Sequence, residues 1–384
     1  MEHLLNPRVK NIEISGIRKF YNMVSEIENV LSFTIGLPDF PTPLHIKDKA
    51  IEAIQMDCTT YTHNAGILEL RQEVAKFMDC HYSLKYNPAD EILITVGASQ
   101  AIDIAFRTIL SPGDEVILPG PVYPGYEPLI RLTGGKAVHV DTRETSFKLT
   151  PELISASISD KTKCIVLPYP SNPTGVSLTR EELERIADLV KGKDIFILAD
   201  EIYSELTLDT THTSIGSILR EQTITINGLS KSHSMTGWRI GFLMAPKAIA
   251  KHMIKVHQYN VSCASSVSQM AALEAMKNGE HDPATMREEY KKRRDYVYNR
   301  LKSMNLQTVL PDGAFYFFIK IPKGFKNSLD FALQLVQTEK VAVVPGSAFS
   351  EYGEGYFRLS YAVSMEQLTE GLNRIERFLV KAIK

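Results

Sequence analysis

The chain has 384 residues, of which 44% are hydrophobic and 23% charged, and its formal net charge is −2. This near-neutral, ordinary globular composition argues against nucleic acid or an anionic membrane surface as a partner. No apolar run approaches the roughly 20 residues that span a bilayer, and MEHLLNPRVKNIEISGIRKF lacks a signal-peptide core. The four cysteines and ten histidines form no metal-binding pattern. We therefore expect a cytoplasmic protein with free thiols and no metal site.

Short hydrophobic runs alternate with helical patterns through the first two thirds of the chain. Thr179 and Glu182 have the spacing of a capping box at the start of one such helix, TREELERIADLVK. The expected strands are residues 91–96, 114–120, 136–141, 163–170, 194–200, 223–227 and the run RIGFLMA at 239–245. Continuous Val, Ile and Leu runs separated by helices are typical of a mostly parallel sheet covered on both faces. We expect a large α/β domain over residues 45–280.

The last hundred residues have a different pattern. DPATMREEYKKRRDYVYNRLKSM is expected to form one long helix, with Pro283 in its first turn. Three apolar runs follow, GAFYFFIKI, VAVVPG and GYFRLSYA, and then an amphipathic helix. Its apolar positions are Leu368, Leu372, Ile375, Phe378, Leu379 and Ile383. We expect a smaller α+β domain over residues 281–384, with residues 1–44 packing against it or at the domain junction.

Small and polar residues follow the predicted strands at their carboxyl ends. Ligands of open α/β sheets bind beyond these ends, and small residues at a helix start leave backbone N–H groups free for a phosphate. The residues in question are Gly97, Ala98 and Ser99, then Ser171 to Gly175 with Asn172, then Asp200 and Tyr203, and finally Lys231 and Arg239. Each alone has an ordinary explanation, such as a helix cap, a turn or a solvated side chain. Their occurrence together, in this order, predicts a binding site.

Pyridoxal phosphate is a cofactor that needs this combination of groups. It requires a lysine for covalent attachment and a carboxylate that keeps its pyridine nitrogen protonated. It also requires a phosphate cradle, which an arginine can reinforce through paired hydrogen bonds. Lys231, in a Gly/Ser-rich turn, and Asp200 meet the first two needs, and Asn172 and Tyr203 have suitable donors for the 3′-oxygen.

These residues resemble those of the fold-type I, class I and II pyridoxal-phosphate aminotransferases. GLSKSHSMTGWRIG is similar to the lysine motif of that family, and SNPTG, ADEIY, YTHNAGILELR and FRLSYA are similar to its other landmarks. The resemblance covers essentially the whole chain. It implies a large domain with a mostly parallel seven-stranded sheet between helices, a smaller α+β domain, and a homodimer with shared active sites.

The resemblance implies a role for each residue at the cofactor. Lys231 would hold pyridoxal 5′-phosphate and move a proton between Cα and C4′, while Asp200 would pair with the pyridine nitrogen. Tyr203 and Asn172 would donate to the 3′-oxygen, and Tyr123 would stack on the ring. The phosphate would be held by Ala98, Ser99, Ser230, Arg239 and, from the neighbouring subunit, Tyr61.

The resemblance also implies how substrates bind. Arg358 would bind the α-carboxylate, with Gly36 and Asn172 beside it. The expected reaction moves an amino group between an L-amino acid and a 2-oxo acid, with glutamate and 2-oxoglutarate as one pair. SGIRKF, PYPSNPTG and SKSHSMTGWRIGF are similar, more narrowly, to bacterial enzymes assigned as N-acetyl-LL-diaminopimelate aminotransferases of lysine biosynthesis.

The sequence departs from the aspartate enzymes of that family at two places. Gly228 stands where a phosphate-binding serine is common, so Ser230 is assigned that role instead. No arginine occurs between residues 240 and 286 to bind a distal carboxylate, which weakens the case for aspartate as substrate. Arg18 is either a contact to the substrate side chain or a solvated helix residue.

Other activities share this set of residues. A C–S β-lyase or a racemase would use the same lysine and aspartate, and aspartate or aromatic aminotransferases remain alternatives. A transcription regulator with an aminotransferase-like domain would need a DNA-binding module ahead of it. The residues before the expected large domain show no recognition-helix pattern and no basic surplus.

Overall fold

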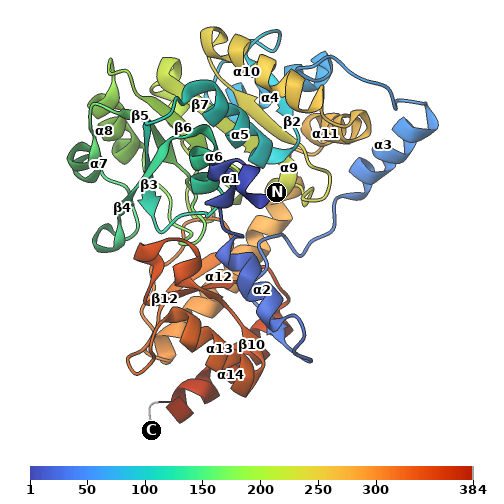
Figure 1. Ribbon diagram of the computed structural model, residues 1–384. Helices are drawn as coiled ribbons and strands as arrows, with labels where there is room; N and C mark the ends of the chain where they lie inside the picture. The colour runs from blue at the N-terminus through green and yellow to red at the C-terminus, as the bar shows by residue number, and fades with distance from the viewer. Residues whose placement is uncertain (383–384) are drawn as a thin grey trace.

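The computed structural model describes residues 1–382, and a seven-stranded sheet lies at the centre of its upper part in Figure 1. The strands lie in the order β2-β8-β7-β6-β5-β3-β4. Only β8 is antiparallel to its neighbours, β2 and β7. Their bounds are β2 Ile92–Thr95, β3 Glu115–Gly120, β4 Lys136–Asp141, β5 Thr162–Leu167, β6 Phe196–Asp200, β7 Thr223–Gly228 and β8 Gly241–Met244. This arrangement confirms the mostly parallel seven-stranded sheet.

Successive strand residues point to opposite sides of this sheet, and both sides are apolar. Helices therefore cover both faces. In β5, Cys164 and Val166 pack with α5, α6 and α10, whereas Ile165 and Leu167 pack on the opposite face, where α7 and α8 lie. Next to them on that second face, α3, α4 and α11 cover β2 and β8. The bounds are α3 Leu44–Gln55, α4 Leu68–Tyr82, α5 Gly97–Ile109, α6 Tyr126–Thr133, α7 Pro151–Ser157, α8 Arg180–Val190, α10 Lys247–Val261 and α11 Ser266–Asn278. The predicted capping box of Thr179 and Glu182 is present at the start of α8.

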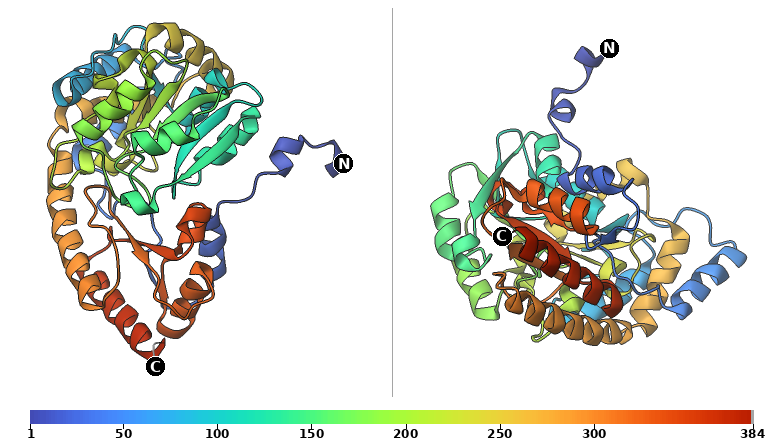
Figure 2. Two further views of the ribbon diagram at one scale, coloured as in Figure 1. Left: turned by 90° about the vertical axis from the view of Figure 1, so that its left-hand side faces the viewer. Right: turned by 90° about the horizontal axis from the view of Figure 1, so that it is seen from below.

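The lower part of the molecule contains an antiparallel sheet in the order β11-β12-β9. The apolar run VAVVPG forms two short strands on different sheets: β11 joins this sheet, while β10 pairs with β1. The long helix α12 runs from the upper to the lower part (Figure 2). The bounds are β1 Leu31–Ser32, β9 Tyr316–Lys320, β10 Val341–Ala342, β11 Val344–Pro345, β12 Tyr356–Ser360, α12 Asp282–Ser303, α13 Ser328–Glu339 and α14 Met365–Ala382.

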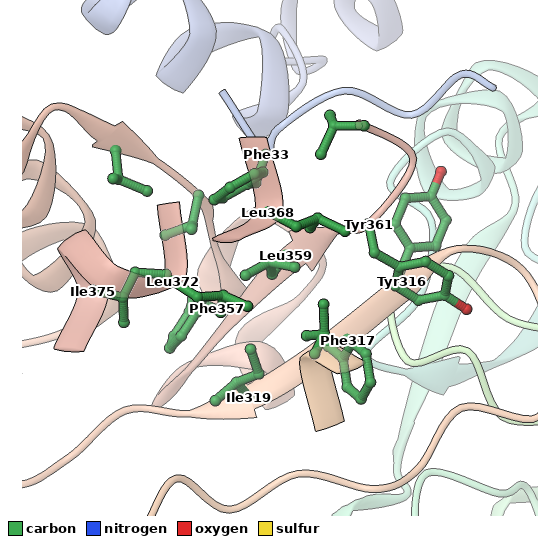
Figure 3. Close-up of a cluster of buried hydrophobic side chains, with 14 of the residues drawn as sticks. Phe33, Tyr316, Phe317, Ile319, Phe357, Leu359, Tyr361, Leu368, Leu372 and Ile375 are labelled. Carbon is green, nitrogen blue, oxygen red and sulfur yellow. The ribbon is translucent and has the colours of Figure 1, made fainter. Parts of the chain in front are cut away.

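A second hydrophobic core holds the lower part together. Its aromatic and aliphatic residues come from β9, β12 and α14, and Phe33 packs beside them (Figure 3). The predicted apolar positions of the last helix, from Leu368 to Leu379, lie in this core, and Ile383 lies outside the described residues. Helix α2 (Gly16–Val24) contributes Phe20 and Val24 to the same core. Domain boundaries near residues 45 and 281 stay a prediction.

The N-terminal segment extends away from this second core (Figure 2). Its short helix α1 (Pro7–Lys10) reaches α6, where Arg8 Nη1 donates to the carbonyl oxygen of Leu132 over 3.3 Å. Within residues 1–382, every helix is too short or too polar to cross a membrane.

Candidate active site

A cavity of about 400 Å³ opens at the carboxyl ends of the parallel strands. This is the edge of an open α/β sheet at which ligands bind. The sequence-predicted residues that line the cavity are Gly36, Ala98, Ser99, Tyr123, Asn172, Asp200, Tyr203, Ser230, Lys231, Arg239 and Arg358. Tyr61 does not reach the cavity of its own chain, because it lies on the surface with 86% of its area exposed.

Lys231 lies on a one-turn helix, α9 (Leu229–Ser232), where the sequence suggested a turn. Its Nζ donates a hydrogen bond to the carbonyl oxygen of Gly36 over 2.5 Å. Burial is the main reason that the pKa of Lys231 falls from 10.5 to about 8, and the positive charges of Arg358 and Arg239 add to the effect. A substantial fraction of this amine is therefore neutral near pH 8.

Asp200 is the last residue of β6 and is only 7% exposed. Its Oδ2 accepts a hydrogen bond from the Tyr126 hydroxyl over 2.6 Å, and its Oδ1 accepts one from the backbone N–H of Ile202 over 3.3 Å. Burial raises the pKa of Asp200, while these two donors favour its ionised form and oppose that rise. The carboxylate thus faces the cavity with its orientation fixed by two donors.

The N-terminus of α5 lines one end of the cavity with Ala98 and Ser99. Gly97, its first residue, has φ +74°, and a Cβ there would lie 2.2 Å from Nη2 of Arg239. A Cβ on Gly241 would lie 2.5 Å from the backbone carbon of Gly97, so β8 and α5 touch through two glycines. No side chain caps α5, which leaves the N–H groups of its first turn, at Ala98 and Ser99, free for an anion.

The packing around Gly228 explains its departure from the expected serine. A Cβ on Gly228 would lie 2.9 Å from the carbonyl oxygen of Ile240, so a larger side chain does not fit without a shift of β8. Ser230, two residues further on, is buried and lines the cavity. Ser230 therefore stands where it can contact the same ligand.

Arg358, at the centre of β12, forms a second positively charged group and is 1% exposed. Its Nη1 donates to Oδ1 of Asn172 over 2.9 Å and its Nη2 to the carbonyl oxygen of Thr34 over 2.7 Å. Its Nε has no partner among the described residues, and its two hydrogen bonds there go to an amide and a backbone carbonyl, not to a carboxylate. Burial lowers the pKa of Arg358 below its usual range. A buried guanidinium without a counter-ion is a site for a carboxylate, which it can bind through paired hydrogen bonds.

Residues 28–375 match the family described as aminotransferase class I and II. The chain belongs to this family. It is 63% identical over 381 residues to the Bacillus subtilis protein named "Probable N-acetyl-LL-diaminopimelate aminotransferase", covering 99% of this chain and 97% of the relative.

Solved structures of the same family have the same fold. The aromatic aminotransferase of Pyrococcus horikoshii OT3 has a TM-score of 0.90 at 40% identity, over 95% of this chain and 99% of that one. The aspartate aminotransferase of Thermus thermophilus with maleate has a TM-score of 0.93 at 36% identity, over 97% and 99%. The family and the fold expected from the sequence are thereby confirmed, and the chain is a transferase.

The cavity of this aminotransferase also contains residues that the sequence did not indicate. Tyr126 and Tyr316 lie in runs that appear purely structural in the sequence, at the start of a helix and within an apolar strand. Thr34, Ile17 and Thr236 also line the cavity. Ile17 lies within SGIRKF and Thr236 within GLSKSHSMTGWRIG, but the sequence indicated no role for either residue. By contrast, Arg18 is exposed and does not line it, which agrees with a solvated helix residue.

Proposed function

We propose that this aminotransferase uses pyridoxal 5′-phosphate to move an amino group between an L-amino acid and a 2-oxo acid. The observation that carries the proposal is Lys231, a lysine with its pKa lowered to about 8 at the centre of a cavity that holds three other charged groups. One is the buried carboxylate of Asp200. The others are the guanidinium groups of Arg239 and Arg358, on the phosphate and substrate sides.

The residues present fit the chemical groups of this cofactor. The free N–H groups at the start of α5, the Ser230 hydroxyl and Arg239 suit a phosphate dianion. Asp200, fixed by Tyr126, suits a protonated pyridine nitrogen. Tyr203 remains a neutral hydrogen-bond donor, because burial raises its pKa well above 10. The Arg358 guanidinium is then available to bind a substrate carboxylate.

Different residues of the chain carry out different parts of amino transfer. When bound, pyridoxal phosphate supplies an electron sink for the Cα–H bond that is broken. Lys231, when neutral, accepts the Cα proton and returns it, since its lowered pKa brings proton transfer within the working range of pH. Arg358 binds and orients the α-carboxylate, which holds the Cα–H bond near Lys231.

For the substrate, we propose N-acetyl-LL-diaminopimelate with 2-oxoglutarate and glutamate as the second pair, in lysine biosynthesis. The name of the 63% identical relative supports this choice. Arg239 and Arg358 are the only arginines among the described residues that line the cavity, and Ile17 and Leu37 give its wall an apolar part. Within the described residues, the cavity thus offers no further guanidinium for a distal carboxylate, which aspartate, glutamate and N-acetyl-LL-diaminopimelate all carry, so the choice among them rests on the relative. An aromatic substrate is the second candidate, because the apolar wall also suits it.

We also propose a cytoplasmic homodimer in which Tyr61 completes the phosphate site of the neighbouring subunit. Tyr61 is a large side chain left almost fully exposed, and the nearby helix α3 exposes further apolar residues. These are Leu44, Ile51 and Ile54, followed by Met56. A partner subunit would cover such a surface. Sedimentation of the active enzyme as a monomer would contradict this assembly.

The decisive experiment compares the visible spectrum and the reaction products of the wild type and two lysine variants. The wild type should carry a yellow band that bleaches with glutamate and with N-acetyl-LL-diaminopimelate. Lys231→Ala should lose the band and turnover, whereas Lys136→Ala, at an exposed lysine of β4, should keep both. A persistent band with release of pyruvate and ammonia from cystathionine would indicate a C–S lyase instead. An unaltered Lys231→Ala variant would refute the proposed role of the lysine.

A further inference from the structure

Tyr316, on β9, contacts two other residues of the cavity, Tyr203 through its hydroxyl and Arg358 through its ring. Its hydroxyl oxygen lies 2.9 Å from that of Tyr203, and Cζ of Arg358 lies 4.4 Å from the centre of its ring. We propose that Tyr316 is a positioning residue: its hydroxyl directs the Tyr203 proton into the cavity, and its ring fixes the plane of the Arg358 guanidinium. This inference rests on the proposed function, because it assumes a ligand oxygen beside Tyr203 and a carboxylate at Arg358.

The hydroxyl part of the argument follows from proton counting. A phenol has one proton to donate and can accept at its oxygen, and in the Tyr203–Tyr316 pair either hydroxyl can be the donor. If Tyr203 donates to a ligand oxygen in the cavity, its own oxygen can accept only from Tyr316. Tyr316 has no other hydrogen-bond partner among the described residues, so its proton is available for this bond. Burial raises the pKa of both phenols, which keeps both protonated.

The ring part of the argument follows from strand pairing. In the antiparallel pair of β9 and β12, Arg358 is opposite Phe318 and Ser360 is opposite Tyr316. Tyr316 and Arg358 are therefore diagonal neighbours on the same face of the sheet. The Tyr316 ring lies against the guanidinium, and Phe349, at 5.2 Å, also contacts it. An aromatic face attracts the cation and prevents the planar group from tilting.

The surroundings hold Tyr316 itself in place. Its ring is fully buried at the edge of the second core, and its hydroxyl points away from the aliphatic side chains of that core (Figure 3). The backbone of Gly36 passes close to this hydroxyl: a Cβ there would lie 3.1 Å from it. The same glycine accepts the hydrogen bond of Lys231. Tyr316 is thus confined between the backbone of Gly36, Tyr203 and Arg358.

The test separates the two parts with two substitutions in the cofactor-loaded enzyme. Tyr316→Phe keeps the ring and removes the hydroxyl, and Tyr316→Leu removes both. One readout is the midpoint of the pH titration of the visible band, which reports the hydrogen bonds at the ligand oxygen beside Tyr203. The other is the Kd of glutarate, an unreactive dicarboxylate that reports the state of Arg358. Tyr361→Phe is the matched control, because it removes a buried hydroxyl that bonds only the carbonyl oxygen of Ala314.

We expect Tyr316→Phe to raise the titration midpoint by about half a pH unit or more, because a weaker donor leaves more charge on the ligand oxygen to hold the neighbouring proton. Its Kd for glutarate should stay within about twofold of wild type, whereas Tyr316→Leu should weaken glutarate binding about fivefold or more. The control should change neither value. Should Tyr316→Leu not fold, Tyr316→Met replaces it.

Two results would overturn the inference. An unchanged midpoint in Tyr316→Phe would show that the hydroxyl does not direct Tyr203. Unchanged glutarate binding in the folded Leu or Met variant would show that the ring does not hold Arg358. A wild type without any visible band would instead contradict the proposed cofactor, so the two failures are distinguishable.

Discussion

Replacing Arg358 with methionine should raise the pKa of Lys231. The fall of this pKa from 10.5 to about 8 corresponds to about 3 kcal/mol of preference for the neutral amine. Burial is the largest cause and Arg358 the second, so the arginine accounts for on the order of 1 kcal/mol. The pKa of Lys231 should therefore rise from about 8 toward about 9, which lowers the neutral fraction at pH 7 from about a tenth toward about a hundredth.

The assay follows the attachment of pyridoxal phosphate to the cofactor-free protein as a function of pH. Only a neutral amine attacks the aldehyde, so the rate constant for appearance of the visible band should rise with pH and level off above the pKa of Lys231. Arg358→Met should move this curve to higher pH. Arg287→Met, which removes an arginine outside the cavity, should leave it in place. A curve that is unchanged or moves to lower pH in Arg358→Met would refute the electrostatic argument.

Three further predictions concern the cavity and the core. Gly97→Ala should raise the Kd for pyridoxal phosphate about tenfold or more in a fluorescence titration, because its Cβ would displace the Arg239 guanidinium. Because the lowered pKa of Lys231 favours the neutral amine in the folded state, the cofactor-free protein should gain stability between pH 8 and 10.5 in urea unfolding, and Lys231→Met should reduce that gain. Phe317→Ala should cost about 3–5 kcal/mol in the same assay, since the ring is fully buried in the second core.

The polar groups at the strand ends were predictable because they depend on local order along the chain. A parallel sheet brings the residues after β2, β5, β6 and β7 to one edge, whatever the details of packing. The sequence therefore indicated Asp200 and Lys231 from their positions alone, and the structure places both in the cavity. The same logic predicted an anion site at the start of α5, and Ala98 and Ser99 line the cavity there.

Tyr126 and Tyr316 were not predictable, because their partners lie far away in the sequence. Tyr126 bonds Asp200 across 74 residues, and Tyr316 bonds Tyr203 across 113. An aromatic residue at a helix start or in an apolar strand has the same appearance whether its hydroxyl is structural or faces a ligand. The division of VAVVPG had a similar cause: β10 and β11 find different partner strands on either side of Val343, which only the tertiary structure determines.

The charges of the cavity indicate how bound ligands would change the pKa of Lys231. Arg239 and Arg358 both lower the pKa of this lysine, and Asp200 alone raises it. A phosphate bound at Arg239 would cancel one of the two positive contributions, and a substrate carboxylate at Arg358 would cancel the other. Each anion should therefore raise the pKa of the amine, which makes the neutral amine a stronger base but lowers the neutral fraction at a given pH. The two arginines thus favour the neutral amine before ligands bind, and the bound anions then increase its basicity.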